Sequence, residues 1–196
     1  MRTIKFKKMM PLILTVIISI FYSENILAQQ FKLDNAKSAL TVYGTSSLHD
    51  WEIKAQKQSG IVALQKEENL TLTQLEVSIE AESLKSYKTA MDKNTYKALK
   101  TDQHKFITFK LVQVKKMEDL GNSVYRVTAS GKLTIAGVAK TTDLTFKMQM
   151  SSNAVTLEGE KTFNMTEYDI KPPTALLGTV KTGDQITIKF KTILTN

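Results

Sequence analysis

Apolar and polar residues alternate along most of this chain, and this period of two constrains the fold more than any other feature. Leu40 and Val42, for example, alternate with Thr41 and Tyr43. Successive side chains of a strand point to opposite faces of a sheet, so each such segment predicts a strand with one apolar face. The pattern occurs in residues 40–43, 51–55, 70–81, 107–111, 125–135, 144–150, 155–163 and 186–190.

About eight such strands, most joined by short polar turns such as residues 119–122, favour an antiparallel sheet. A sheet of this size must protect its edges, and closure into a barrel does so. We therefore expect an all-β protein built as an eight-stranded antiparallel barrel.

Two segments depart from simple alternation. In residues 70–81 the apolar positions shift from even to odd numbers, which predicts a β-bulge near Thr73 and Gln74. Residues 88–100 have apolar and small side chains at helical spacing, which predicts one short helix inserted between two strands. Such a helix would plug or cover one end of the barrel.

Residues 1–28 have the pattern of a secretory signal peptide, cleaved after Ala28. Four basic residues lie among the first eight, and residues 12–22 form an apolar run interrupted only by Thr15 and Ser19. The alternative is a membrane anchor, but the run is shorter than the roughly 20 residues that a span needs. We expect residues 29–196 to form a single domain that is periplasmic or secreted.

Composition excludes several classes of protein. Without residues 1–28 the chain keeps 23 basic and 18 acidic residues, a net charge of 23 − 18 = +5, which does not suggest a nucleic-acid partner. There is no cysteine, so no disulfide framework forms and no lipid can be attached to an N-terminal cysteine. The two histidines, His49 and His104, have no metal-ligand spacing, and we expect neither a metal nor a cofactor. The sequence leaves the oligomeric state open.

The inward-facing positions of the predicted strands are aliphatic or aromatic. An eight-stranded barrel is either filled by such side chains or just wide enough to hold one small apolar ligand, and both alternatives stay open. Trp51 is likewise either a wall against which a ligand stacks or a core aromatic. The candidate cavity-lining residues are Val42, Trp51, Ile53, Val77, Ile79, Phe109, Val127, Leu133, Ile135, Phe146, Met148, Ile188 and Phe190.

The stretch GTSSLHDWEIK brings a serine, a histidine and an aspartate close together, as in a hydrolase triad. In a strand, however, His49 and Asp50 point to opposite faces, and no G-x-S-x-G pattern is present. These groups instead suggest the mouth of a barrel. The apolar loop 171–178, stiffened by two prolines, is either a lid on that mouth or a loop packed on its rim. The candidate mouth residues are Thr45, Ser46, Ser47, His49, Leu176 and Leu177.

Several short stretches, in order, resemble the YceI family of lipid- or polyisoprenoid-binding-like domains. They are residues 31–34 with 38–40, residues 92–109, the stretch GKLTIAGVAKTTDLTF at 131–146, and residues 168–170 with 180–186. The resemblance covers nearly all of residues 31–194. It implies a lipocalin-like barrel that holds a long apolar molecule.

We therefore expect an exported protein, not an enzyme, that binds a long apolar lipid of isoprenoid or fatty-acyl type for sequestration or transport. Lysines on the outer face would permit transient contact with an anionic membrane surface. Two alternatives remain. One is a lipid or ester hydrolase that uses His49 and a nearby serine, and the other is a packed barrel that acts through a protein partner.

Overall fold

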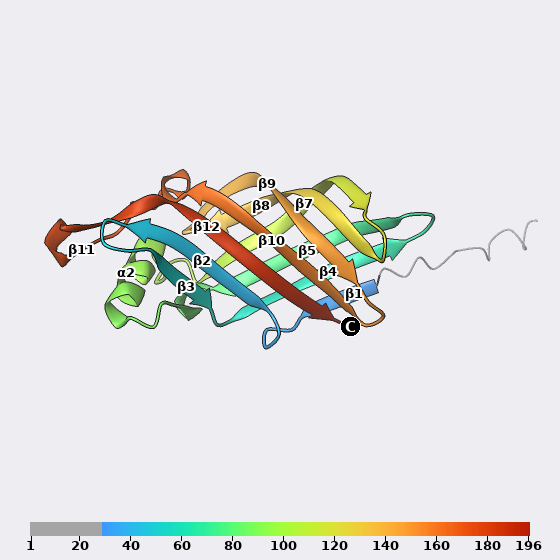
Figure 1. The fold of residues 1–196 in the computed structure, drawn as a ribbon, viewed down its shortest axis with the longest axis horizontal. Coiled ribbons are helices and arrows are strands. Elements are labelled where there is room, and N and C mark those ends of the chain that lie inside the picture. The colour runs from blue at the N-terminus through green and yellow to red at the C-terminus, as the bar shows by residue number, and fades with distance from the viewer. Residues whose placement is uncertain (1–28) are drawn as a thin grey trace, which may run out of the picture.

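The computed structural model describes residues 29–196, so the predicted signal peptide lies outside the described residues. Within them the chain forms twelve strands, one α-helix and three short 3₁₀ helices (Figure 1). The strands are β1 (Gln29–Leu33), β2 (Ala39–Ser46), β3 (Trp51–Ala55), β4 (Gln58–Lys66), β5 (Leu70–Glu80), β6 (Leu84–Lys85), β7 (Phe106–Asp119), β8 (Val124–Ile135), β9 (Val138–Met150), β10 (Ala154–Asn164), β11 (Thr174–Ala175) and β12 (Val180–Thr195). The helices are α2 (Thr89–Leu99), η1 (Ala81–Ser83), η2 (Met165–Tyr168) and η3 (Leu176–Gly178).

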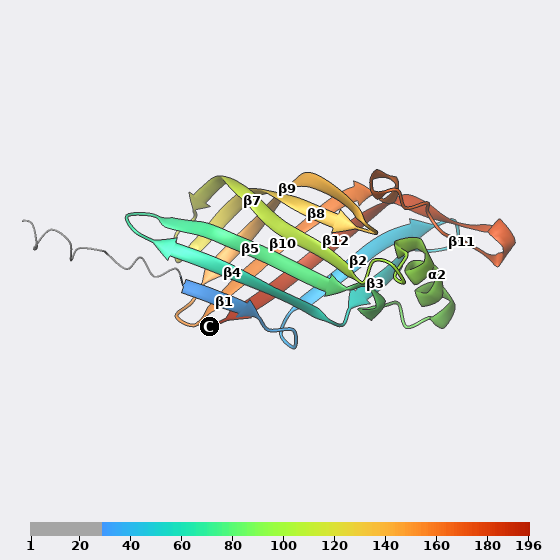
Figure 2. The same ribbon diagram turned by 180° about the vertical axis from the view of Figure 1, so that it is seen from behind.

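The predicted eight-stranded antiparallel barrel is confirmed: its strands follow the order β1-β4-β5-β7-β8-β9-β10-β12, and it closes because β12 also pairs with β1. Two strands of this ring, β1 and β4, were not among the predicted segments, whereas the predicted strands β2 and β3 lie outside the ring. The long strand β12 has two partners on the same side. It pairs with β1 near residue 195 and with β2 over residues 182–191. Strands β2, β3 and β6 therefore continue the wall at the end of the barrel where α2 lies, which we call the helix end (Figures 1 and 2).

The two predicted departures from alternation are confirmed. The pairing of β4 with β5 moves from Ala63 opposite Gln74 to Leu64 opposite Leu72, so Thr73 is the bulged residue. Its hydroxyl donates to the carbonyl oxygen of Ala63 at 3.1 Å. The helix predicted at 88–100 is α2. Strand β4 was not predicted, because residues 61–64 are consecutively apolar and show no alternation.

The stretch 131–146 forms the hairpin of β8 and β9. Its two turn residues, Ala136 and Gly137, have φ angles of 49° and 83°. Positive φ at both central positions defines the tight turn whose twist matches that of the flanking strands. The turn therefore sets the long register that pairs Val124 with Gln149 and Ile135 with Val138.

The interior divides into two clusters along the barrel axis. At the end opposite α2, side chains such as Phe31, Val127 and Met148 are fully buried and pack against one another. At the helix end, a second cluster includes Leu40, Leu99 and Phe163. Within residues 29–196, no helix combines the length and hydropathy that crossing a membrane would require.

Candidate functional site: an apolar cavity under the helix

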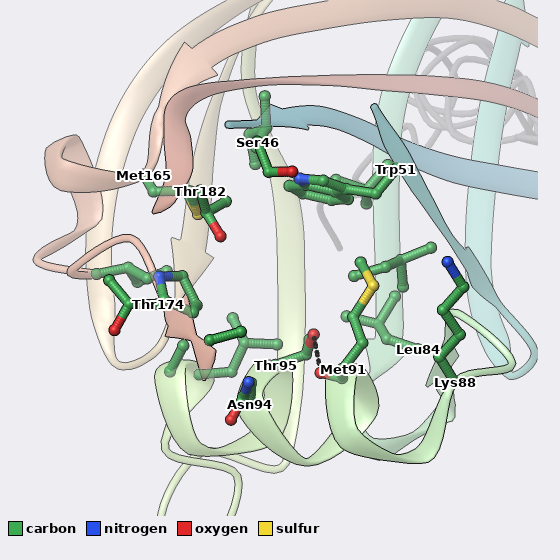
Figure 3. Close-up of a pocket in the computed structure, with 18 of the residues that line it drawn as sticks. Ser46, Trp51, Leu84, Lys88, Met91, Asn94, Thr95, Met165, Thr174 and Thr182 are labelled. Carbon is green, nitrogen blue, oxygen red and sulfur yellow. Dashed lines mark hydrogen bonds between the residues drawn. The ribbon is translucent and has the colours of Figure 1, made fainter. Parts of the chain in front are cut away.

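The helix end of the barrel encloses a cavity of about 360 Å³ that opens between the barrel rim and α2 (Figure 3). Most of its lining is apolar. The strands contribute Leu40, Val42, Ser46, Trp51, Ile53, Ile79, Leu84, Ile107, Ile135, Phe163, Thr174, Ala175, Val180, Thr182, Ile186 and Ile188. The helix and the connecting segments contribute Leu48, His49, Lys88, Ala90, Met91, Asn94, Thr95, Ala98, Leu99, Met165, Ile170 and Pro173.

Helix α2 presents one face to this cavity because Met91, Thr95 and Ala98 recur at helical spacing. Its position is held by side chains outside the cavity. The hydroxyl of Tyr96 lies 2.9 Å from the carbonyl oxygen of Glu82 and accepts a hydrogen bond from Lys85 Nζ at 2.5 Å. These bonds tie the helix to the segment that precedes it, so α2 forms the cover of the barrel end.

Trp51 forms a wall of the cavity and packs against Gly44, its partner across β2 and β3. A Cβ atom on Gly44 would lie 2.1 Å from Cζ2 of the indole, so the ring occupies the space that any other residue would fill. The indole Nε1 donates to the carbonyl oxygen of Thr45 at 2.9 Å. Glycine at position 44 therefore lets the half-buried ring lie flat against the wall.

The serine and histidine of the β2–β3 connection hydrogen-bond to the backbone of their own turn. The Ser46 hydroxyl donates to the carbonyl oxygen of His49 at 2.7 Å, and Nδ1 of His49 lies 2.7 Å from the carbonyl oxygen of Asp50. A carbonyl oxygen can only accept, so Nδ1 carries the proton. The ring is thus oriented by a main-chain oxygen and not by a carboxylate, and the arrangement holds a turn without assembling a triad.

Only some of the candidate mouth residues line the cavity. Ser46 and His49 line the cavity, whereas Ser47 Oγ accepts a hydrogen bond from the Lys181 backbone N–H at 3.1 Å and fastens the turn to β12. Thr45 contributes its carbonyl oxygen to Trp51 and does not line the cavity. Leu177 is fully exposed, and the side chain of Leu176 lies outside what the structure describes.

The loop 171–178 contributes Pro173, Thr174 and Ala175 to the cavity wall. Its strand β11 pairs with β12, Thr174 opposite Lys181 and Ala175 opposite Val180. The loop therefore extends the rim of the mouth and projects beyond the end of the barrel (Figure 1). That it acts as a lid stays a prediction.

A second cavity of about 100 Å³ lies deeper in the barrel. It shares Leu40, Ile79, Ile107 and Ile188 with the first, so the two cavities abut. The remaining lining residues are Leu75, Val77, Thr108, Phe109, Leu133, Thr142, Leu144, Phe146, Leu157, Lys161, Phe190 and Thr192.

The predicted cavity residues fall into four groups. Val42, Trp51, Ile53 and Ile135 line the main cavity only, and Ile79 and Ile188 line both cavities. Those that line the inner cavity only are Val77, Phe109, Leu133, Phe146 and Phe190.

Val127 and Met148 form the fourth group: both are fully buried in the packed end and line neither cavity. The alternation along a strand predicts which side chains face the interior. It does not predict where along the barrel axis the packed core ends and the cavity begins. The contribution of α2 was not among the predicted cavity residues, although its helical spacing signals it.

Among residues 29–196, no three His, Asp or Glu side chains gather closely enough to hold a metal ion. Gln58 carries a buried polar group in the barrel interior. The side-chain amide of Gln58 is buried and has no hydrogen-bond partner among the described residues. Gln58 lies opposite Ile79 in the β4–β5 pair, so it shares the inner face of the barrel.

These features define a class of protein: a closed antiparallel barrel, packed at one end, with an apolar cavity under a helix at the other. Residues 31–194 match the model of the YceI-like domain, and the chain belongs to this family. A comparison with curated proteins gave no match.

Solved structures share the fold at low sequence identity. BcnA of Burkholderia cenocepacia is 19% identical, with a TM-score of 0.65 over 82% of this chain and 98% of that chain. A polyisoprenoid binding domain from Saccharophagus degradans, described as implicated in plant cell wall breakdown, is 14% identical, with a TM-score of 0.67 over 84% and 97%. The Campylobacter jejuni YceI protein is 17% identical, with a TM-score of 0.52 over 72% and 82%.

Proposed function

We propose that this protein binds one long apolar lipid, of isoprenoid or fatty-acyl type, in the barrel cavity, and that it is an exported binding protein that sequesters or carries this lipid. The observation that carries the proposal is the apolar cavity between the barrel wall and α2. An apolar chain placed there would gain about 0.8 kcal/mol for each buried methylene group.

Three further observations support this function over catalysis. The Saccharophagus degradans domain that shares the fold is described as binding polyisoprenoids. Ser46 and His49 hydrogen-bond to main-chain carbonyl groups of their own turn. Only a few polar groups, such as Lys88 and Asn94, line the main cavity, so most of its wall suits the hydrocarbon part of a lipid. Export rests on the signal-like pattern of residues 1–28.

Transient contact with a membrane surface belongs to the same proposal. Leu48, at the mouth, is 68% exposed, and Leu177 projects fully into solvent from the η3 segment. Lys88 lines the same cavity as Leu48, and Lys181 pairs with Thr174 of the loop that carries Leu177, so both lysines belong to this end of the barrel. Flotation with vesicles tests the contact. Binding to phosphatidylglycerol vesicles, weakened in Leu48→Glu and absent with phosphatidylcholine, is expected, and equal flotation with both lipids would remove the contact from the proposal.

Tryptophan emission tests the binding function directly, since Trp51 is the single tryptophan and lines the cavity. Delipidated protein is titrated with a long-chain isoprenoid quinone, which quenches a nearby indole, and with an unbranched fatty acid of 16 carbons. Saturable quenching at one equivalent of quinone, and its reversal by the fatty acid, are expected.

Ala98→Phe provides the matched variant, because Ala98 projects from α2 into the cavity. Ala139→Phe makes the same change at an exposed position of β9 and serves as the control. We expect at least a tenfold loss of affinity in Ala98→Phe alone. Binding that is unsaturable, or equal in the two variants, would contradict the proposed site.

A further inference from the structure

The barrel wall opens between β9 and β10 on the helix side. Their pairing begins at Met150 opposite Val155 and ends at Phe146 opposite Gly159. Both strands continue beyond that pair, to Val138 and to Asn164, without further pairing to each other among the described residues. The inner cavity reaches this opening, where Thr142 and Leu144 of β9 and Lys161 of β10 line it.

Lys161 stands at an inward-facing position of β10. It lies opposite Ile188 of β12, which lines both cavities, and directly opposed residues of an antiparallel pair share one face. The neighbouring pair, Glu160 opposite Lys189, is on the outer face, where the two side chains form a 3.6 Å ion pair. Lys161 is therefore the only charged side chain that lines the inner cavity in the described part of the chain.

The ammonium group of Lys161 is incompletely paired. Its Nζ donates to the main-chain carbonyl oxygen of Asp143 at 2.9 Å, across the opening. An ammonium has three donors, and no carboxylate of residues 29–196 forms an ion pair with this one.

The nearby Asp143 carboxylate is already engaged. Lys115 Nζ lies 2.7 Å from its Oδ2, and this hydrogen bond, with a smaller electrostatic effect of Lys161, holds the pKa of Asp143 below its usual value. Lys161 is half-buried as a residue, and its ammonium group thus keeps donor capacity for an anion that enters the cavity. Charge-assisted hydrogen bonds of this kind are among the strong ones in proteins.

We propose that Lys161 binds the carboxylate of a long-chain fatty acid, whose hydrocarbon chain runs from the inner cavity into the main cavity under α2. The four residues shared by both cavities mark the point where the chain would pass from one to the other. The head group thus lies at the β9–β10 opening and the end of the chain lies toward the helix. This inference rests on the proposed function, because it requires that the barrel binds an apolar chain.

The test compares cis-parinaric acid, a fluorescent fatty acid of 18 carbons, with its methyl ester. The two probes have the same chain and differ in charge. Both are titrated into the delipidated wild type, Lys161→Met and Lys161→Arg. Lys147→Met is the matched control, since Lys147 is exposed on the outer face of β9. Thermal unfolding followed by circular dichroism establishes that each variant is folded.

The wild type and Lys147→Met should bind the acid at least about tenfold more tightly than the ester. Lys161→Met should lose this preference through weaker binding of the acid, with binding of the ester kept, and Lys161→Arg should retain it. Equal binding of acid and ester by the wild type would overturn the assignment even if Lys161→Met did not fold. An acid preference that survives in folded Lys161→Met would also overturn it.

Failure of the wider proposal is distinguishable from failure of this assignment. Binding of the ester without any preference for the acid leaves the apolar site intact and removes only the role of Lys161. If the wild type binds neither probe, then both the apolar site and the assignment of Lys161 fail.

Discussion

Trp51 packs closely on Gly44, and this contact predicts the effect of Gly44→Ala on stability. The substitution should destabilise the protein when Trp51 is present but not when Trp51 is replaced by alanine. A methyl group at position 44 would lie 2.1 Å from Cζ2 and 2.6 Å from Cε2 of the indole, atoms in the body of the ring. In Gly44→Ala the ring must therefore move into the cavity, and its Nε1 must leave the carbonyl oxygen of Thr45.

The magnitude follows from three contributions. Overpacking costs about 1–3 kcal/mol, and loss of the indole hydrogen bond costs about 0.5–1.5 kcal/mol. Alanine is preferred over glycine within a strand by about 0.5–1 kcal/mol, which offsets part of this. We expect Gly44→Ala to lower the free energy of unfolding by about 1–3 kcal/mol. It should also weaken ligand binding, because the displaced ring occupies the cavity.

A double-mutant cycle isolates the contact. In a Trp51→Ala background neither the clash nor the indole hydrogen bond exists, so Gly44→Ala should be neutral or stabilising by about 0.5–1 kcal/mol. Urea unfolding followed by far-ultraviolet circular dichroism measures all four proteins, since Trp51 is the only tryptophan and its removal abolishes the indole signal. An equal cost of Gly44→Ala in both backgrounds would refute the reasoning.

Other parts of the molecule give further predictions. Gln58→Leu should raise the free energy of unfolding by about 1–3 kcal/mol in urea, because it removes a buried amide without a partner; a destabilised variant would show that the amide is satisfied. Lys115→Ala should raise the pKa of Asp143 toward its ordinary value in a ¹³C NMR titration. The folded-state pKa is depressed, so this ion pair stabilises the fold above the ordinary pKa and is lost as pH falls through the folded value; an unchanged titration would count against it. Phe163→Ala removes a buried ring packed edge-on against Tyr168, with centroids 5.2 Å apart, and should cost about 3–5 kcal/mol of unfolding free energy, whereas a cost below 1 kcal/mol would mean that the site collapses without a void.

The period of two carried enough information to predict the barrel, and the phase shift at residues 70–81 located the bulge at Thr73. Strand β4 was not predicted, because its apolar residues are consecutive and do not alternate with polar ones. The arrangement around His49 could not be predicted, since its ring and the Ser46 hydroxyl bond to main-chain oxygens that no residue pattern encodes. The inward position of Lys161 could be predicted, because Lys161 has the same place in the alternation of β10 as Leu157 and Phe163.

The opening between β9 and β10 could not be predicted from the sequence. Strand phase says nothing about where two neighbouring strands stop pairing, and this pairing ends at Gly159, within strands that both continue. The division of the interior into a packed end and a cavity is hidden for a related reason. Val127 in the packed end and Ile135 at the main cavity are both apolar, inward-facing residues of β8.

Analysis of the lipid bound to the natural protein tests the central claim most directly. The protein is purified from its natural host without detergent, and an organic extract is examined by mass spectrometry against the protein concentration. We expect close to one equivalent of a long-chain apolar lipid. An extract without such a lipid, from protein whose Trp51 emission also does not respond to added quinone or fatty acid, would contradict the account.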